Sequence, residues 1–249
     1  KERGRKGRRI ARATSAVDAP PFITRKIPVY ELASEELLAL VEENTEIILE
    51  EIGIDFRDDP RALQLFRDAG ALVEEERVRF PRGMCREIIQ RNAPNEFTQH
   101  ARNPDRSVQI GGDHAVFVPA YGPPFVRDLD SGRRYATIED FKNFTKLTWM
   151  SPALHHSGGT LCEPVDVPVN KRHLDMIYSH LRWSDKPFMG SVTAPERAQD
   201  TVDMAEIVFG RSFVDSHCVI TSLINANSPM TFDATMLGAA RVYAQHNQA

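Results

Sequence analysis

Cysteine is scarce in this chain of 249 residues, and its placement excludes the structures that cysteines usually build. Cys85, Cys162 and Cys218 are widely separated and form no Cys-x-x-Cys motif. An odd number of cysteines at such spacing indicates neither a disulfide framework nor a local zinc motif, so we expect reduced, mostly buried thiols. The alternative is a metal site at strand ends made by His155, Cys162, His217 and Cys218, because imidazole and thiolate suit zinc.

Long apolar runs are also absent. No stretch approaches the roughly 18 apolar residues that span a membrane, and the N-terminus lacks the apolar core of a secretory signal, about 7–15 residues long. We therefore expect a cytoplasmic protein. The chain also lacks Gly-x-Gly-x-x-Gly, Walker, Gly-x-Ser-x-Gly and His-Glu-x-x-His motifs. These absences disfavour a dinucleotide enzyme, a nucleotide hydrolase, a serine hydrolase and a metalloprotease.

The charge is unevenly distributed. The net charge is −4, with 41% hydrophobic and 27% charged residues, as in soluble globular proteins. Only Glu2 opposes the basic residues of the first twelve positions: Lys1, Arg3, Arg5, Lys6, Arg8, Arg9 and Arg12. Such an arm can bind nucleic acid or an acidic partner, but a solvated tail is the more ordinary interpretation. We therefore expect no nucleic-acid partner.

Capping signals predict three helices before residue 112. The first runs from a Ser34 cap to Gly53, with Leu37, Leu40, Val41, Ile48 and Ile52 on one face. The second runs from Asp59 to Gly70, and the third from Pro81 to about Arg91. We divide the chain into a basic arm and extended lead-in (1–33), a helical N-terminal region (34–112) and a third domain (113–249). Gly111-Gly112 is interpreted as a hinge.

The third domain repeats a strand, a loop and an amphipathic helix four times. Strands are predicted at 115–120, 153–156, 187–192 and 218–224, with a hairpin near 130–132. The helices begin near Thr137 with a capping box, before Leu174, at a Thr193 cap with Pro195 near the helix start, and near Phe232. Such units build parallel sheets, and four are half the number that closes a TIM-type β/α barrel. We expect an α/β fold and a longer protein, since the last helix has no stop signal.

A β/α barrel carries its chemistry in the loops after the strands, which selects candidate residues without a motif. Tyr121 can place its ring against a cation, an attraction of about 1–2 kcal/mol in a dry site. The alternative is a rim aromatic that packs on Pro123 and Pro124. Gly122 follows the first predicted strand and Ser191 lies at the end of the third, so both join the set of substrate-binding candidates.

Four further candidates are amides and imidazoles. Asn225 and Asn227 would point to the same side of an extended segment and can orient a carboxylate or an amide. Alternatively, they satisfy backbone groups in a turn or cap the next helix. His155 and His156 are adjacent, so one of them can face the interior as a general acid or base. Ordinary hydrogen-bonded histidines are the alternative. No catalytic residue and no metal ligand is assigned.

Five strings, taken in order, resemble the trimethylamine methyltransferase family of corrinoid-dependent methyltransferases. They are Gly53-Ile54-Asp55-Phe56, Arg77-Val78-Arg79-Phe80-Pro81, Gly122-Pro123-Pro124-Phe125-Val126-Arg127-Asp128, Ser184-Asp185-Lys186-Pro187 and Asn227-Ser228-Pro229. The resemblance implies a β/α barrel behind a helical region, in a protein about twice as long. It also implies transfer of a methyl group from a methylated or quaternary amine to the Co(I) of a corrinoid (cobalamin) on a separate protein.

The resemblance gives the candidates roles. Tyr121 would hold the ammonium group, and Asn225 with Asn227 would hold the carboxylate of a betaine. The corrinoid would be bound by the cognate corrinoid protein and not tightly by this chain, which would form a homo-oligomer. The family's pyrrolysine position lies beyond Ala249, so trimethylamine and quaternary amines stay open as substrates. Two other functions stay open as well: a non-catalytic α/β domain that binds an amine or a partner, and a zinc-dependent barrel methyltransferase.

Overall fold

The three predicted N-terminal helices are present, and side-chain caps begin the first two of them. The structure is a computed structural model that describes residues 19–249, so the basic arm lies outside the described residues. Helix α2 (Glu35–Ile47) begins at Ser34, whose Oγ accepts a hydrogen bond from Leu37 N at 3.3 Å. It continues into a π-helical turn, η1 (Ile48–Ile52), and ends at Gly53 with φ 76°.

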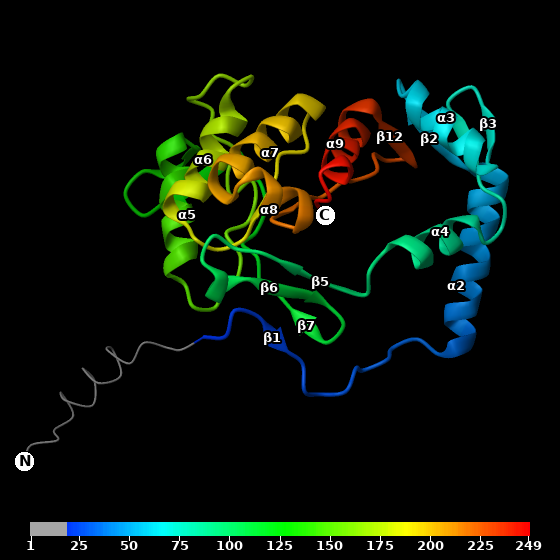
Figure 1. Cartoon of the computed structure of the whole chain (residues 1–249), viewed down its shortest axis with the longest axis horizontal. Helices are drawn as coiled ribbons and strands as arrows, with labels where there is room; N and C mark the ends of the chain where they lie inside the picture. The colour runs from blue at the N-terminus through cyan, green and yellow to red at the C-terminus, as the bar shows by residue number, and fades with distance from the viewer. Residues whose placement is uncertain (1–18) are drawn as a thin grey trace, which may run out of the picture.

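Helix α3 (Pro60–Ala69) starts from the Asp59 carboxylate, which accepts a hydrogen bond from Ala62 N at 3.0 Å. The left-handed Gly70 ends the helix, and α4 (Met84–Asn92) is the third helix. All three lie together at one end of the molecule, with α2 along the outer edge (Figure 1).

Short strands accompany these helices. β2 (Ile54–Arg57), β4 (Arg77–Arg79) and β3 (Leu72–Glu74) form an antiparallel sheet, and β12 (Thr231–Asp233) adds a parallel strand beside β2. The prediction of a helical region over 34–112 missed these strands, because three or four residues are too few to show a period of two. Pairing with β12 joins this end of the chain to a strand 176 residues further along.

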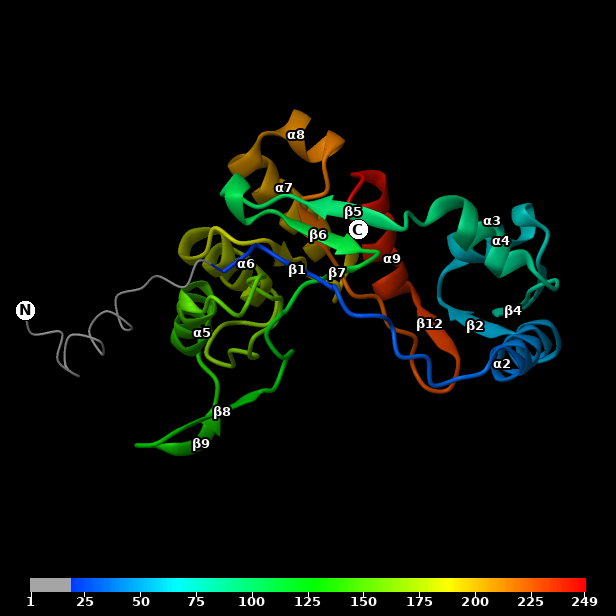
Figure 2. The same ribbon diagram turned by 90° about the horizontal axis from the view of Figure 1, so that it is seen from below.

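A second antiparallel sheet has the order β1 (Ile23–Thr24), β7 (His114–Ala115), β6 (Val108–Gly111) and β5 (Glu96–Gln99). A 3₁₀ turn, η2 (Pro104–Arg106), joins β5 to β6. Gly111 and Gly112 have φ of 101° and 54° in the tight turn between β6 and β7. The prediction of a hinge there was wrong, since the glycines serve a hairpin. The sheet lies beside the helices that follow it in the chain (Figure 2).

The four helices predicted after residue 113 are confirmed: α5 (Ile138–Met150), α6 (Arg172–Trp183), α7 (Pro195–Phe209) and α9 (Ala234–Gln245). The Thr137 capping box with Asp140 is present, and so is the hairpin of β8 (Phe125–Asp128) and β9 (Gly132–Tyr135). The prediction that Thr193 caps α7 was wrong, because Ala194 precedes that helix and makes no side-chain cap. A short helix, α8 (Arg211–Ser216), follows α7.

The predicted strands are shorter than expected. Two of them, β10 (Phe188–Met189) and β11 (Ile220–Thr221), form a parallel pair. The strand predicted at 115–120 was wrong in extent, because only Ala115 is paired, in antiparallel β7. Residues 116–124 and 151–160 contain no regular strand. Backbone hydrogen bonds nevertheless join the first stretch to the second, where His155 N donates to Phe117 O at 3.0 Å. They also join the second stretch to the start of the third predicted strand, where Ser157 N donates to Pro187 O at 2.8 Å.

We call 117–122, 155–160, 187–191 and 219–221 the four core segments. They lie side by side in chain order, as the α/β prediction requires, but residues 19–249 show no closed barrel. Irregular hydrogen bonding at prolines and glycines shortens the recognised strands. No helix among the described residues is long and apolar enough to cross a membrane.

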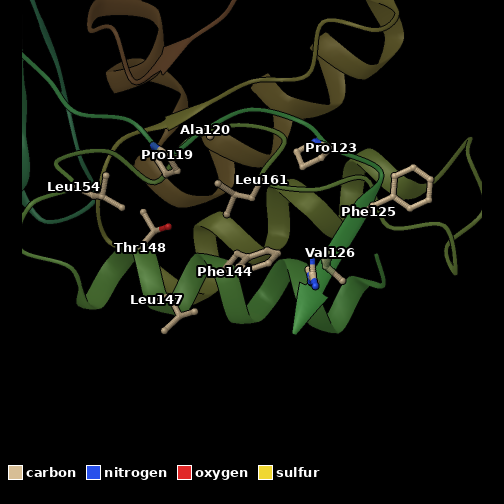
Figure 3. A pocket seen from close by; sticks show the side chains of 11 residues that line it. Pro119, Ala120, Pro123, Phe125, Val126, Phe144, Leu147, Thr148, Leu154 and Leu161 are labelled. Carbon is tan, nitrogen blue, oxygen red and sulfur yellow. The ribbon is translucent and has the colours of Figure 1, made fainter. Parts of the chain in front are cut away.

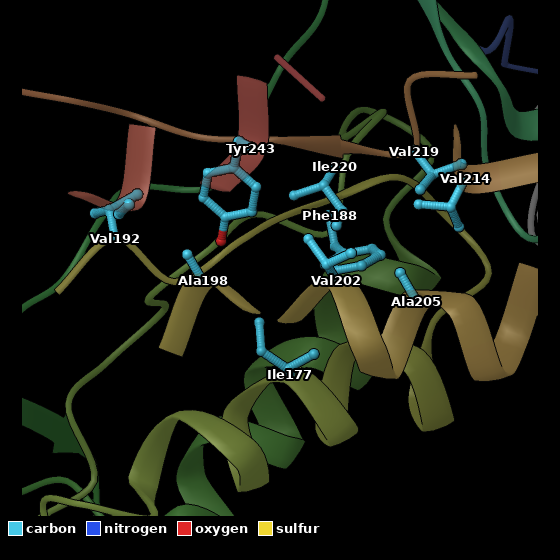
Figure 4. Packing of buried hydrophobic residues seen from close by; sticks show 11 residues of the cluster. Ile177, Phe188, Val192, Ala198, Val202, Ala205, Val214, Val219, Ile220 and Tyr243 are labelled. Carbon is cyan, nitrogen blue, oxygen red and sulfur yellow. The ribbon is translucent and has the colours of Figure 1, made fainter. Parts of the chain in front are cut away.

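The largest core lies between these segments and the helices (Figure 4). Phe188 and Ile220 contribute from β10 and β11, and Ile177, Val202 and Tyr243 from α6, α7 and α9. Full burial of each such side chain stabilises the fold by about 1.5–3 kcal/mol. The apolar spacing predicts an inner face of Ala198, Val202, Ala205, Val208 and Phe209 on α7; the first three are buried, whereas Val208 is 38% exposed. On α6 the spacing predicts Leu174, Ile177, Tyr178 and Leu181; Ile177 is buried, but Leu174 and Tyr178 are exposed, and His173 and His180 are buried in their place.

Candidate functional site

The ends of the first three core segments meet around Tyr121. Gly122 N donates to Thr160 O at 2.6 Å, and Met189 N donates to Gly158 O at 2.9 Å. A Cβ at Gly159 would lie 2.7 Å from Cε2 of Tyr121, so only glycine lets this ring approach the second segment. The ring of Tyr121 packs against the backbone at Gly159, and the side chain is still 47% exposed, so a ligand can reach it. The structure therefore brings Tyr121 and Gly122 together with the Gly158-Gly159 loop.

Ser191 ends the third segment beside a cation. Ser191 O accepts a hydrogen bond from Tyr243 Oη at 2.6 Å, and its Oγ lies 3.5 Å from Thr193 Oγ1. Arg197 Nη1 donates to the same Thr193 oxygen at 2.8 Å. Among the described residues, Arg197 forms no ion pair with a carboxylate. Arg197 is not among the candidates selected from the sequence. The signal that could have selected it is a basic residue in the first turn of the helix that follows the third segment.

His156 lies beneath the loops in the interior. Its Nδ1 accepts a hydrogen bond from Gly158 N at 2.9 Å, so Nε2 carries the proton and donates to Gln99 Oε1 at 3.0 Å. Burial lowers the pKa of His156 to about 3. The ring is therefore neutral at ordinary pH, and both of its nitrogens are used. This geometry matches the alternative of a hydrogen-bonded core histidine.

Gln99 connects the segments from below. Its Nε2 donates to Phe188 O at 2.8 Å and to Val219 O at 3.2 Å, while Oε1 also accepts from Thr221 Oγ1 at 3.3 Å. The side chain belongs to β5 in the second sheet and is fully buried. One amide thus joins the second, third and fourth segments. No sequence signal for this role was recognised, because a lone glutamine in a polar stretch is unremarkable.

His155 faces away from this group. Its Nδ1 accepts a hydrogen bond from Phe117 N at 2.9 Å, and its ring stacks on Phe117 with centroids 5.6 Å apart. Burial, and then the charge of Lys186, lower the pKa of His155. Lys186 Nζ donates to three carbonyls, those of Thr148, Ser151 and Leu154. His155 therefore belongs to the entry side of the second segment and not to the loops at its end.

The loop is also held from behind by α6. His180 Nε2 donates to Gly159 O at 2.8 Å, and Nδ1 accepts from Ser157 Oγ at 2.7 Å. Burial lowers the pKa of His180 to about 4. A second neutral histidine thus fixes the backbone on which Tyr121 rests. The prediction had not included His180, because it lies mid-helix and not at a strand end.

The two asparagines have separate environments. Asn227 exchanges backbone hydrogen bonds with Thr231, and its Nδ2 donates to Asp233 Oδ2 at 2.8 Å. Asp233 in turn caps α9 by accepting from Met236 N at 3.0 Å. Asn227 thus serves the turn, as the alternative interpretation had it. Asn225 is exposed, and no hydrogen bond of its side chain is found among the described residues.

The four residues of the zinc alternative are not brought together in the described part of the chain. Cys162 is buried among apolar side chains, and burial raises the pKa of its thiol to about 12. His217 stacks on Phe213 with centroids 4.1 Å apart, and Cys218 Sγ donates to Ile220 O. All three cysteines are free, but only Cys162 is fully buried.

The chain matches the family model described as trimethylamine methyltransferase (MTTB) over residues 1–249. It belongs to this family. Over 224 residues it is 46% identical to the glycine betaine methyltransferase of Desulfitobacterium hafniense (strain Y51). The alignment covers 90% of this chain and 46% of that protein, so the chain spans about half the length of this relative. The resemblance inferred from the five strings is confirmed.

Proposed function

We propose that this chain is part of an enzyme that moves a methyl group from a betaine-type quaternary amine to the Co(I) of a corrinoid on a separate protein. The observation that carries the proposal is the 46% identity, over 90% of the chain, to a protein named glycine betaine methyltransferase. Family membership supports methyl transfer, and the relative's printed substrate supports the betaine class.

The chemistry asks this chain to bind and desolvate a cation. The methyl carbon exchanges its C–N bond for a bond to cobalt, and the amine leaves neutral with the C–N electron pair. No proton has to move. The half-exposed ring of Tyr121 suits the ammonium group, because a cation over an aromatic face gains most where water is excluded. Arg197, with Ser191 and Thr193 beside it, replaces the asparagine pair as our choice for the carboxylate.

We further propose that the four core segments are the first half of a β/α barrel (113–249) behind the N-terminal region (34–112). An apolar groove lies along the first segment (Figure 3). It supports the proposal that the remaining part of the full-length protein packs there and closes the barrel. Leu147 and Phe125 are among the residues that border this groove, together with Pro119, Ala120, Pro123, Val126, Phe144, Leu154 and Leu161. A helix and a strand from the rest of the full-length protein would fill it.

The full-length protein, mixed with its corrinoid protein in the Co(I) state, tests the function. Glycine betaine, a longer betaine, choline and trimethylamine are added separately, and the cobalt absorption spectrum is followed. We expect the Co(I) bands to disappear with a betaine only. Reaction with trimethylamine alone would overturn the substrate class, and no reaction with any amine would overturn the proposal.

Replacing Tyr121 with alanine in the full-length enzyme should raise the KM for the betaine about tenfold. The reason is the loss of an aromatic contact with a desolvated cation, which is worth about 1–2 kcal/mol. Tyr121→Phe keeps the ring and should stay near the wild-type KM. Tyr178→Ala removes an exposed tyrosine from the outer face of α6 and is the matched control. An unchanged KM in Tyr121→Ala would make this residue rim packing.

A further inference from the structure

His173, in the first turn of α6, has one ring nitrogen without a protein partner in the interior. Its Nε2 lies 2.7 Å from Oδ2 of Asp200 on α7. A carboxylate accepts hydrogen bonds, so Nε2 carries a proton and donates to Asp200. The side chain is 7% exposed, and its Nδ1 is buried with no hydrogen-bond partner among residues 19–249. An unpaired polar atom in the interior is costly, and native proteins rarely contain one.

A small cavity lies beside this ring, between α6 and the ends of the second and third core segments. On one side it is bordered by His173 and Met176 of α6, and on the other by the loop residues Gly159, Thr160 and Ser191. Its volume is about 30 Å³. One molecule of liquid water occupies about the same volume, so the cavity is too small for an amine substrate or a hydrated metal ion. The occupant that fits is a single water.

The cavity also offers the further partners that an internal water needs. Gly159 and Thr160 have N–H groups that donate to no backbone carbonyl among the described residues. A water in the cavity can accept a hydrogen bond from one of these groups and donate one to His173 Nδ1, and internal waters make two to four such bonds. A water suits the ring in either protonation state, because its oxygen accepts when Nδ1 carries a proton.

We propose that His173, oriented by Asp200, holds one internal water in this cavity and through it positions the loops of the candidate site. Gly159 lies against the ring of Tyr121, and Ser191 ends the third segment, so the water joins α6 to the backbone on which both depend. Nδ1 has almost no exposed surface, so further chain that packs on the outside does not contact it. The positioning role rests on the proposed function, whereas the water site does not.

A crystal structure of the full-length protein, at a resolution that shows ordered water, tests the site without substrate or corrinoid. We expect one water in the cavity, about 2.7–3.2 Å from His173 Nδ1. His173→Phe removes both ring nitrogens and should lose the water. His173→Asn places an amide where Nδ1 lies and should keep the water, although it loses the bond to Asp200. A wild-type cavity without water, or a protein group bonded to Nδ1, would overturn the proposal.

The kinetics of the full-length enzyme with the betaine measure the positioning role. Loops that bind substrate without joining the methyl exchange affect KM and not kcat, so His173→Phe should raise KM about fivefold and change kcat less than about twofold. His173→Asn should stay near the wild-type KM. The control is His246→Phe at the end of α9, where the ring lies 3.9 Å from Asp215. A KM in His173→Asn as high as in His173→Phe would assign the effect to Asp200 and not to the water. A wild type that is inactive with every amine would contradict the proposed function, whereas the crystal structure decides the water site independently.

Discussion

Gln99→Leu should lower the free energy of unfolding of the full-length protein by about 3 kcal/mol. The substitution keeps most of the volume but removes the amide that serves three segments. It leaves the His156 Nε2–H in the interior without a partner, and it removes the side-chain bonds to Phe188 O and Val219 O, which keep the backbone bonds of the β10–β11 pair. An unsatisfied buried group costs about 1–3 kcal/mol, and each lost hydrogen bond costs about 0.5–1.5 kcal/mol. Urea unfolding followed by circular dichroism measures the change.

Gln64→Leu is the matched control for that prediction. Gln64 lies on the exposed side of α3, and its Nε2 donates only to Asp68 Oδ1 at 2.7 Å. The same substitution there should change stability by no more than about 0.5 kcal/mol. If Gln99→Leu were equally mild, water or a rearranged segment would satisfy the freed groups. Gln99 would then not be the connection between the second sheet and the core segments that we describe.

Acid should destabilise this protein before its carboxylates titrate. Burial lowers the pKa of His156 to about 3 and that of His180 to about 4, whereas an unfolded histidine has a pKa of about 6.5. Below that value the unfolded chain takes up protons that the folded chain refuses. The resulting loss of stability is absent well above pH 6.5 and grows as the pH falls from there toward 4, because only the unfolded state becomes protonated in that range. Together, the two rings should cost about 3–4 kcal/mol between pH 7 and pH 5.

Urea unfolding of the full-length protein at pH 7, 6 and 5 measures this loss. His180→Asn should lower stability at every pH but remove about half of the dependence on pH. That difference in slope separates a titrating histidine from a merely structural one. Equal slopes for the variant and the wild type would contradict the assignment of a neutral, buried His180, which donates to Gly159 O.

Local signals predicted the helices well, and long-range contacts explain what was missed. Ser34, Asp59 and Thr137 cap helices through atoms a few residues away, so the caps could be recognised in the sequence. The pairing of β12 with β2 joins residues that no local pattern connects. The strands of both N-terminal sheets are two to four residues long and depend on such pairing.

The candidate site divides in the same way. The rule that loops follow strands found Tyr121, Gly122 and Ser191, which the structure places at neighbouring segment ends. Asn227 matched the same rule but is held by Asp233 in its own turn. The rule could not find Arg197 or His180, because both lie on helices and approach the loops only through packing. It also could not orient His155 and His156, because that depends on the start and phase of an irregular segment.

The sequence by itself determined the family, the predicted helices and the absence of a disulfide framework, since each rests on residue identity or on spacing within one segment. Only the tertiary structure decided which side chains share a site. It placed Gln99 beneath three segments, and it turned His155 toward Phe117 and His156 toward Gln99, away from the loops. These outcomes depend on contacts between residues far apart in the chain, whose free energies no local pattern contains.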